Sequence, residues 1–300
     1  MKKFITIVIV IVLIGFGIYY FTKSSPKAPV NQNTTDTTTD STATTTQSQT
    51  SSASPIIGKS AEGRDILAYH FGTGNTEILF VAGSHGGYEW NTVLLAGQLM
   101  NYLQTNPSAI PANLKVTIIP VLNPDGLNKV VGTTSPNFTK ANVSTSEATV
   151  ISGRFNGDNV DINRNFDCDW QATGTWQNKT VSGGSEVFSE PEAQAIKNYV
   201  ETNKPVAVVA FYSAAGGVYA SNCHNGVSAD TKTIMNKFAD ASGYSAYDTF
   251  DFYSTTGDMT NWLAKIGTPA INVLLTNHTD TEWTKNLAGV KALLNYYATK

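Results

Sequence analysis

Apolar runs with the spacing of strands alternate along residues 56–300 with longer runs that have the spacing of helices. The expected strands are at 64–71, 76–82, 114–121, 206–212 and 269–276, and 159–163 is a candidate for one more. The expected helices are at 89–105, 189–203, 229–242, 257–266 and 283–298, and Ser189 with Glu192 predicts a capping box at the second. This alternation predicts one large α/β domain, with a doubly wound mixed central sheet flanked by helices on both faces.

The first 55 residues have a different composition from the rest of the chain. Phe4 to Phe21 is a continuous apolar run, long enough to span a bilayer, and Lys2 and Lys3 before it favour a cytoplasmic N-terminus. We therefore expect residues 1–23 to be an uncleaved signal anchor that holds the domain outside the cell membrane. A cleaved signal peptide and a secreted protein are the alternative. Residues 24–55 are rich in Ser and Thr and lack aromatic residues, so a disordered linker is expected there.

Charge and cysteine content narrow the range of partners and compartments. The net charge of −3 and the lack of a basic patch give no reason to expect a nucleic-acid partner. The chain has two cysteines, Cys168 and Cys223. In an oxidising extracytoplasmic compartment they can form a disulfide. Two free buried thiols are the alternative.

The stretch from Gly157 to Phe166 places an amide and a guanidinium side by side, at Asn163 and Arg164, after the apolar alternation of Val160 and Ile162. Arginine offers a rigid planar fork of donors that matches a carboxylate, and the asparagine amide adds another donor. The pair is therefore a candidate carboxylate site. The alternative is a turn in which Asn165 and Asp161 cap local backbone and Arg164 pairs with a structural acid.

A second candidate site follows the apolar run that ends at Ala82. Glycines come next, and His85 and Glu89 lie four residues apart in the same segment. Loops at the carboxyl ends of strands are where open α/β sheets place ligands, and imidazole and carboxylate groups are common zinc ligands. An ordinary surface pair is the alternative.

Together and in this order, these segments, the turn at Asn123 to Gly126 and the polar loop that begins at Tyr253 resemble the carboxypeptidase A-like zinc metallocarboxypeptidases. The resemblance runs from about Ile57 to the C-terminus and is strongest to bacterial members with a His-Gly-Gly-Tyr-Glu loop. It implies zinc as cofactor and the family fold. It also implies roles for six residues, which are zinc binding by His85 and Glu89, a grip on the substrate carboxylate by Asn163 and Arg164, polarisation of the scissile carbonyl by Arg154, and closure over the substrate by Tyr253.

Two positions of this chain depart from the family pattern in residue type. Tyr212 stands where the family has its third zinc ligand, a histidine, and Leu274 stands where it has its general-base glutamate. The zinc-binding loop also has one residue more than the usual His-x-x-Glu spacing. Among the other histidines, His224 is the best candidate for a replacement ligand, although an ordinary surface position is the alternative.

The departures leave three hypotheses for function. The first is a membrane-anchored protein with a degenerate catalytic centre that binds peptides or cell-wall peptides by their free C-terminal carboxylate. The second is an active zinc carboxypeptidase with an atypical metal site, and the third is a structural or assembly domain. Catalysis is therefore an open question at the level of sequence, since the loss of a general base alone costs roughly 10²–10⁴-fold in rate.

Overall fold

The computed structural model describes residues 56–300. The expected anchor at 1–23 and the expected linker at 24–55 lie outside the described residues. Within 56–300, no helix is both long enough and apolar enough to cross a membrane.

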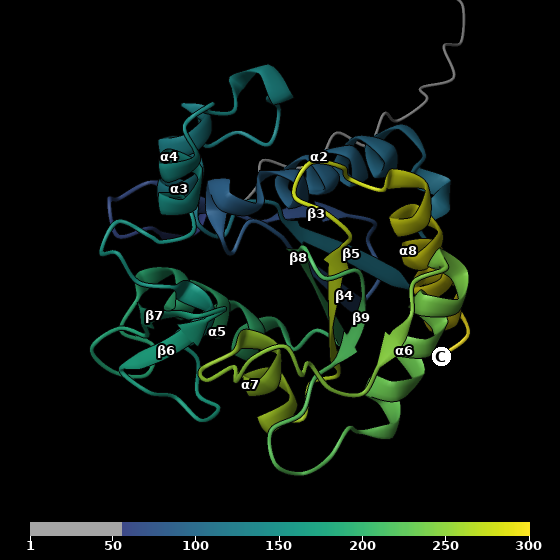
Figure 1. Cartoon of the computed structure of the whole chain (residues 1–300). Coiled ribbons are helices and arrows are strands. Elements are labelled where there is room, and N and C mark those ends of the chain that lie inside the picture. The colour runs from purple at the N-terminus through teal and green to yellow at the C-terminus, as the bar shows by residue number, and fades with distance from the viewer. Residues whose placement is uncertain (1–55) are drawn as a thin grey trace, which may run out of the picture. The chain divides into compact units, whose positions relative to one another are not determined.

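A seven-stranded mixed sheet forms the centre of the domain (Figure 1), and the mixed central sheet with helices is as predicted. Its strands run in the order β10-β9-β11-β8-β4-β5-β3. Four neighbouring pairs are parallel, and the pairs β3–β5 and β9–β11 are antiparallel. The strands are β3 (Tyr69–Phe71), β4 (Thr76–Val81), β5 (Leu114–Ile119), β8 (Ala207–Ser213), β9 (Gly217–Ala220), β10 (Ala246–Tyr247) and β11 (Ala270–Leu275). Two of its strands, β9 and β10, were not expected, and the expected strand at 64–71 is instead two strands, β2 (Asp65–Leu67) and β3, of which only β3 belongs to this sheet.

Helices cover both faces of this sheet. On one face, α2 (Trp90–Thr105), α6 (Ala229–Ser242) and α8 (Trp283–Ala298) bury side chains such as Leu99, Phe238 and Leu293. On the other face, α5 (Pro191–Asn203) and α7 (Met259–Lys265) pack through Ile196 and Trp262. Each face has its own apolar core, because the central strands are buried on both sides.

The smaller elements lie at the periphery of the sheet. They are the ribbon β1 (Ile56–Lys59) with β2 (Asp65–Leu67), the hairpin β6 (Thr173–Trp176) with β7 (Lys179–Ser182), the helices α3 (Pro124–Val131) and α4 (Glu147–Ser152), and the single turns η1 (Gly86–Glu89), η2 (Pro107–Ala109), η3 (Lys140–Asn142) and η4 (Ile162–Arg164).

The expected strand at 159–163 is wrong, because this segment ends in the turn η4 instead. Asn159 has a left-handed backbone, with φ of 61°, which breaks an extended run. The Asp161 side chain then accepts a hydrogen bond from the Asn163 N–H at 3.2 Å and so begins the turn.

The parallel strands β4, β8 and β11 bring their carboxyl ends to the same edge of the sheet. Tyr212 on β8 lies opposite Leu274 on β11, and Ala210 lies opposite Val81 on β4. The loop that follows Val81 therefore starts beside Tyr212, and this edge is where an open α/β sheet builds a ligand site.

The capping box expected at Ser189 and Glu192 is also wrong. Helix α5 begins at Pro191, and its N-cap Glu190 makes no side-chain cap. The fully buried Glu192 carboxyl accepts hydrogen bonds from the Ala61 N–H and from Asn156 Nδ2, each at 3.0 Å. Burial raises the pKa of Glu192 to about 7.

This raised pKa predicts a pH-dependent stability. The folded state holds the Glu192 proton more tightly than the unfolded chain, so its contribution is fully present below about pH 4.5 and is lost as the pH rises to about 7. The loss is on the order of 3 kcal/mol. We expect Glu192→Gln to reduce the fall in melting temperature between pH 4.5 and 8, measured by circular dichroism. The exposed Glu201→Gln on the same helix is the matched control, and parallel curves for wild type and Glu192→Gln would contradict the assignment.

Candidate functional site

The loop after β4 brings His85 and Glu89 into contact despite the additional residue between them. His85 Nδ1 lies 2.8 Å from Glu89 Oε1, and both side chains are buried. The turn η1 takes up the extra residue, and it requires Gly86 at φ of 44°, where a Cβ would lie 2.6 Å from the carbonyl oxygen of Gly153. The longer spacing is therefore accommodated in the backbone of the loop.

Asp161 joins His85 to Arg154 beneath this loop. Its Oδ1 lies 3.3 Å from His85 Nε2, and its Oδ2 accepts from Arg154 Nε at 2.9 Å and from Arg154 Nη2 at 2.8 Å. Burial alone would raise the pKa of Asp161, but the cationic groups of Arg154, His85 and Arg164 lower it strongly. Asp161 therefore stays ionised and fixes both partners.

The charge of Asp161 is consistent with the orientation of the His85 ring. With Nε2 directed at Asp161, the ring presents Nδ1 to Glu89. Burial and the charge of Arg154 lower the pKa of His85, but the carboxylates of Glu89 and Asp161 outweigh them and raise it. Glu89 Oε2 accepts from the Ser213 N–H at 3.0 Å, so Oε1 is the oxygen directed at His85. His85 Nδ1 and Glu89 Oε1 are thus two donors that fit one metal ion.

Tyr212 does not join these two donors. Its ring centre is 5.2 Å from that of His85, but its hydroxyl donates to Asn163 Oδ1 at 3.1 Å. Burial, and next the charge of Asp258, raise the pKa of Tyr212 well above its ordinary value, which disfavours a metal-binding phenolate. Leu274, opposite on β11, brings no ionisable group. The described residues therefore fit two ligands of a zinc centre rather than the three that a catalytic zinc normally has.

Asn163 and Arg164 are held rigidly at the wall of the same cavity. Asn163 Nδ2 donates to Asp258 Oδ2 at 2.8 Å, and Asn163 Oδ1 accepts from the Met259 N–H at 3.0 Å. Arg164 Nη1 donates to the carbonyl of Asn163 at 2.7 Å, and Nη2 donates to the carbonyl of Thr175 at 2.8 Å. Both side chains keep donors that are free to meet a ligand.

The cavity beside Arg164 has a volume of about 270 Å³. Of the catalytic, substrate-binding and metal positions expected from the sequence, every one except His224 lines it. The Arg164 guanidinium lies over the ring of Tyr253, 5.9 Å from its centre. The Arg154 guanidinium lies over Trp176 of the hairpin β6–β7, 4.5 Å from the ring centre. The positively charged end of the cavity is thus built from two buried arginines that stack on aromatic rings.

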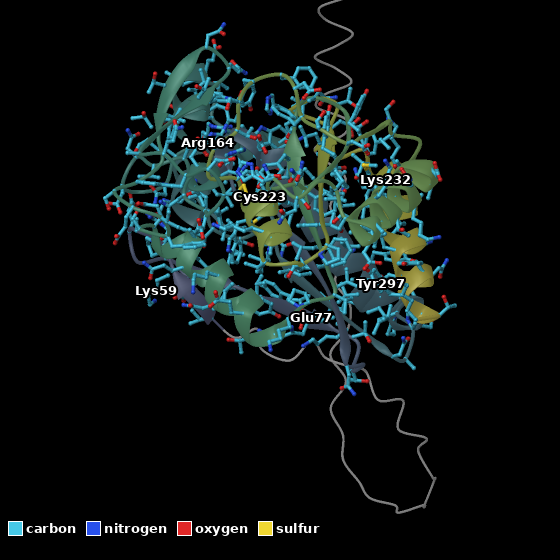
Figure 2. The ribbon with its side chains drawn as sticks, turned by 90° about the horizontal axis from the view of Figure 1, so that it is seen from below. Lys59, Glu77, Arg164, Cys223, Lys232 and Tyr297 are labelled. Carbon is cyan, nitrogen blue, oxygen red and sulfur yellow. A yellow bond between two sulfur atoms is a disulfide. The ribbon has the colours of Figure 1, made fainter. Side chains whose placement is uncertain are left out.

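Cys168 and Cys223 form a disulfide across a sequence separation of 55, with their Cα atoms 6.1 Å apart. In the side-chain view Arg164 lies on the left and Cys223 near the middle, while Lys232 and Tyr297 lie on the right (Figure 2). The neighbouring His224 is largely exposed, and its Nε2 lies 2.7 Å from Asp169 Oδ1. His224 therefore faces the surface rather than His85 and Glu89.

Sequence reasoning did not assign three contributors to this site. Asp161 has a detectable signal, since it stands two residues before Asn163, but its link to His85 depends on long-range folding. Trp176 is brought in by a hairpin that was not expected. His278, after β11, lines a second cavity together with Glu89, Arg154 and Leu274. Burial lowers the pKa of His278, which favours its neutral form.

Comparison with known proteins decides the family. A family profile described as zinc carboxypeptidase matches residues 39–289. The chain belongs to the zinc carboxypeptidase family. The resemblance seen in the sequence is thereby confirmed, and the family implies zinc as its usual cofactor.

Curated relatives match over part of their own length. The chain is 24% identical over 217 residues to gamma-D-glutamyl-L-diamino acid endopeptidase 1 of Lysinibacillus sphaericus, a match that covers 66% of this chain and 54% of the relative. It is 28% identical over 152 residues to bacteriocin BCN5 of Clostridium perfringens, covering 49% of this chain and 15% of the relative. The chain thus spans about half the length of the first relative and much less of the second.

Solved structures of the family share the fold. Murein-tripeptide amidase MpaA from Escherichia coli O157 has a TM-score of 0.58 at 18% identity, covering 83% of this chain and 94% of the amidase. Carboxypeptidase A from Helicoverpa armigera has a TM-score of 0.61 at 17% identity, covering 82% and 67%. These similarities support the carboxypeptidase-like sheet and its helices on both faces.

Proposed function

We propose that this chain binds the free C-terminal carboxylate of peptides through Arg164 and Asn163, with Tyr253 closing over the bound residue. The observation that supports this most directly is the state of Arg164. Arg164 is 1% exposed, and Asp161 acts on it only from beyond ion-pair distance, so among residues 56–300 no carboxylate is in direct contact with its guanidinium. A buried guanidinium without a counter-ion is costly. A ligand carboxylate in the adjoining cavity would neutralise it through a bidentate contact.

Cell-wall peptides are the class of ligand that we favour. The names of two related proteins refer to murein tripeptides and to gamma-D-glutamyl-L-diamino acids. Both names describe short peptides of the kind found in bacterial walls. An extracytoplasmic domain with an intact carboxylate site could meet such fragments, which supports them as ligands of this chain.

We further propose that the catalytic centre is degenerate. Two donors, His85 and Glu89, meet at the metal position, while the Tyr212 hydroxyl is engaged with Asn163. Two protein ligands offset less of the dehydration of a zinc ion than three do, so the metal would be weakly held. Leu274 cannot accept a proton from water. The carboxylate site would then serve binding, not hydrolysis.

An active hydrolase is the second candidate, and His278 is the observation that favours it. Its imidazole lines the cavity that Glu89 and Leu274 also line, and its Nδ1 is buried without a hydrogen-bond partner among the described residues. The neutral imidazole favoured by its lowered pKa is able to accept a proton. His278 could therefore replace the missing base if a metal is held nearby.

Binding of a free carboxylate gives the first functional prediction. Peptides with a free C-terminus should bind the purified protein more tightly than their C-terminal amides, by about 1.5–3 kcal/mol, the range for hydrogen bonds to a charged group. Isothermal titration calorimetry measures this difference. Arg164→Gln should remove it and the partly exposed Arg64→Gln should keep it. Equal affinities of wild type for acid and amide would refute the carboxylate site.

The degenerate centre is tested by restoring the two family residues. Wild type should retain far less than one zinc per chain after dialysis against a weak chelator, measured by elemental analysis, and should release no C-terminal residues. Tyr212→His should gain zinc, and only Tyr212→His combined with Leu274→Glu should also gain hydrolysis, because ligand and base act as a unit. Chelator-sensitive release by wild type, abolished in His278→Phe, would instead establish the active-hydrolase alternative.

We also propose that the N-terminal segment anchors the domain at the outer face of the cell membrane. The support is the apolar run from Phe4 to Phe21 behind two lysines. The full-length protein should then fractionate with membranes and keep residue 1 or 2 as its N-terminus. A mature N-terminus within residues 22–35, found by Edman sequencing of the exported protein, would show a cleaved signal peptide instead.

A further inference from the structure

The disulfide between Cys168 and Cys223 has an imidazole beside it. A ring nitrogen of His224 and the two sulfur atoms lie within 4.8 Å of one another. Both cysteines are buried, whereas the His224 side chain is 71% exposed, so the cluster opens to solvent on the histidine side. Thiolates and imidazoles are the ligands that zinc prefers in proteins. These three groups are therefore a candidate metal site once the sulfur atoms are free.

Two pairs of neighbouring residues build the cluster. Cys168 and Asp169 face Cys223 and His224, with the cysteines joined to each other and Asp169 Oδ1 2.7 Å from His224 Nε2. Neighbouring side chains of an extended chain point to opposite sides, which would separate the members of each pair. Asp169 and His224 instead have left-handed backbones, with φ of 53° and 65°, so the extended run is broken just after each cysteine. The four side chains are thereby gathered at one place.

Asp169 favours the form of the His224 ring that a metal needs. A carboxylate can only accept, so His224 Nε2 carries the proton at their contact, and the lone pair of the neutral ring is on Nδ1. In zinc sites, the ring nitrogen of histidine that does not bind the metal commonly donates to a carboxylate in this way. Asp169 is thus placed to orient a metal-binding histidine.

Hydrogen bonds hold the two segments in place independently of the disulfide. The Cys168 carbonyl accepts from the Gly257 N–H at 2.7 Å, and the Asn222 N–H donates to Asn261 Oδ1 at 3.0 Å. Gly257 and Asn261 lie on either side of the start of α7, so both cysteine segments are fixed to the same helix end. We therefore expect the sulfur atoms to stay close to each other and to His224 after the disulfide is opened.

Opening the disulfide needs a reductant, for which a dithiol is suitable. The dithiol gives two electrons and two protons to the S–S bond, which breaks into two thiols, while the dithiol closes into its own disulfide. A zinc ion then replaces the two thiol protons, because it binds cysteine as thiolate. Zn–S distances of about 2.3 Å separate two tetrahedral sulfur ligands by about 3.8 Å. Cα atoms 6.1 Å apart allow that separation through rotation of the two side chains.

We propose that Cys168, Cys223 and His224 form a zinc site in the reduced protein, with Asp169 orienting the histidine and water as the fourth ligand. Two thiolates and one imidazole with an open fourth position are an established ligand set of zinc. The disulfide and the zinc ion are then alternative cross-links of the same two segments, the first under oxidising conditions and the second after reduction. The site is separate from His85, because none of its residues lines the cavity beside Arg164.

Cobalt(II) is the probe, since it occupies zinc sites and its bond to a thiolate gives a near-ultraviolet charge-transfer band that carboxylate and imidazole ligands do not give. The full-length protein is treated with dithiothreitol, separated from it without oxygen, assayed for free thiols and titrated with cobalt. The reduced protein should show the band, which added zinc should remove, and the oxidised protein should not show it. A disulfide that dithiothreitol does not open, or two free thiols without the band, would overturn the inference.

Variants of the residues next to the cysteines locate the metal. In the reduced protein, His224→Ala should weaken cobalt binding at least about tenfold and Asp169→Asn on the order of tenfold, as loss of the partner of a metal-bound histidine does. Asp167→Asn is the matched control, since this exposed acid precedes Cys168 and pairs with Lys265, and it should keep the affinity. Equal cobalt affinity of wild type and His224→Ala would show binding by the two thiols alone, as in an unfolded chain, and would refute the site.

Discussion

The buried carboxylate of Asp161 is the interaction on which the arrangement of this site depends. It holds the Arg154 guanidinium through two hydrogen bonds, directs the His85 ring, and begins the turn that presents Asn163 and Arg164. A carboxylate with no exposed surface is stable only because these cations surround it. The side chain of Asp161 thus links the loop after β4 to the turn that carries Asn163 and Arg164. These two segments keep their arrangement although other positions differ from the family residues.

Some of the residues that the family pattern implies around Asp161 are present in this chain, and others are changed. The groups that we propose to bind a carboxylate, Asn163 and Arg164, are present in this chain, and Arg164 is anchored to the carbonyl of Thr175. The two changed positions, Tyr212 and Leu274, lie opposite each other on neighbouring strands. The hydroxyl of Tyr212 supports Asn163, so this substitution stabilises the binding residues at the position where the family has a metal ligand. That pattern favours a protein specialised for recognition.

Local sequence signals predict much of the fold, including the bounds of α6 and α8 and the edge of the sheet that carries the site. They fail where contacts between distant segments determine the local structure. The short strand β9 includes Gly217 at φ of 142° and forms by pairing with β11. The sequence therefore has no long apolar run that would predict this strand. Glu192 stands at the position expected for a capping box, but its carboxyl accepts a hydrogen bond from the Ala61 N–H instead.

The central claim is that the carboxylate site is intact while the metal centre is incomplete. A crystal structure determined with excess zinc and a peptide with a free C-terminal carboxylate tests both halves at once, because anomalous scattering locates the metal. The account predicts the peptide carboxylate at Arg164 and no zinc at full occupancy between His85 and Glu89. A fully occupied zinc held by His85, Glu89 and a third side chain of this chain would contradict it.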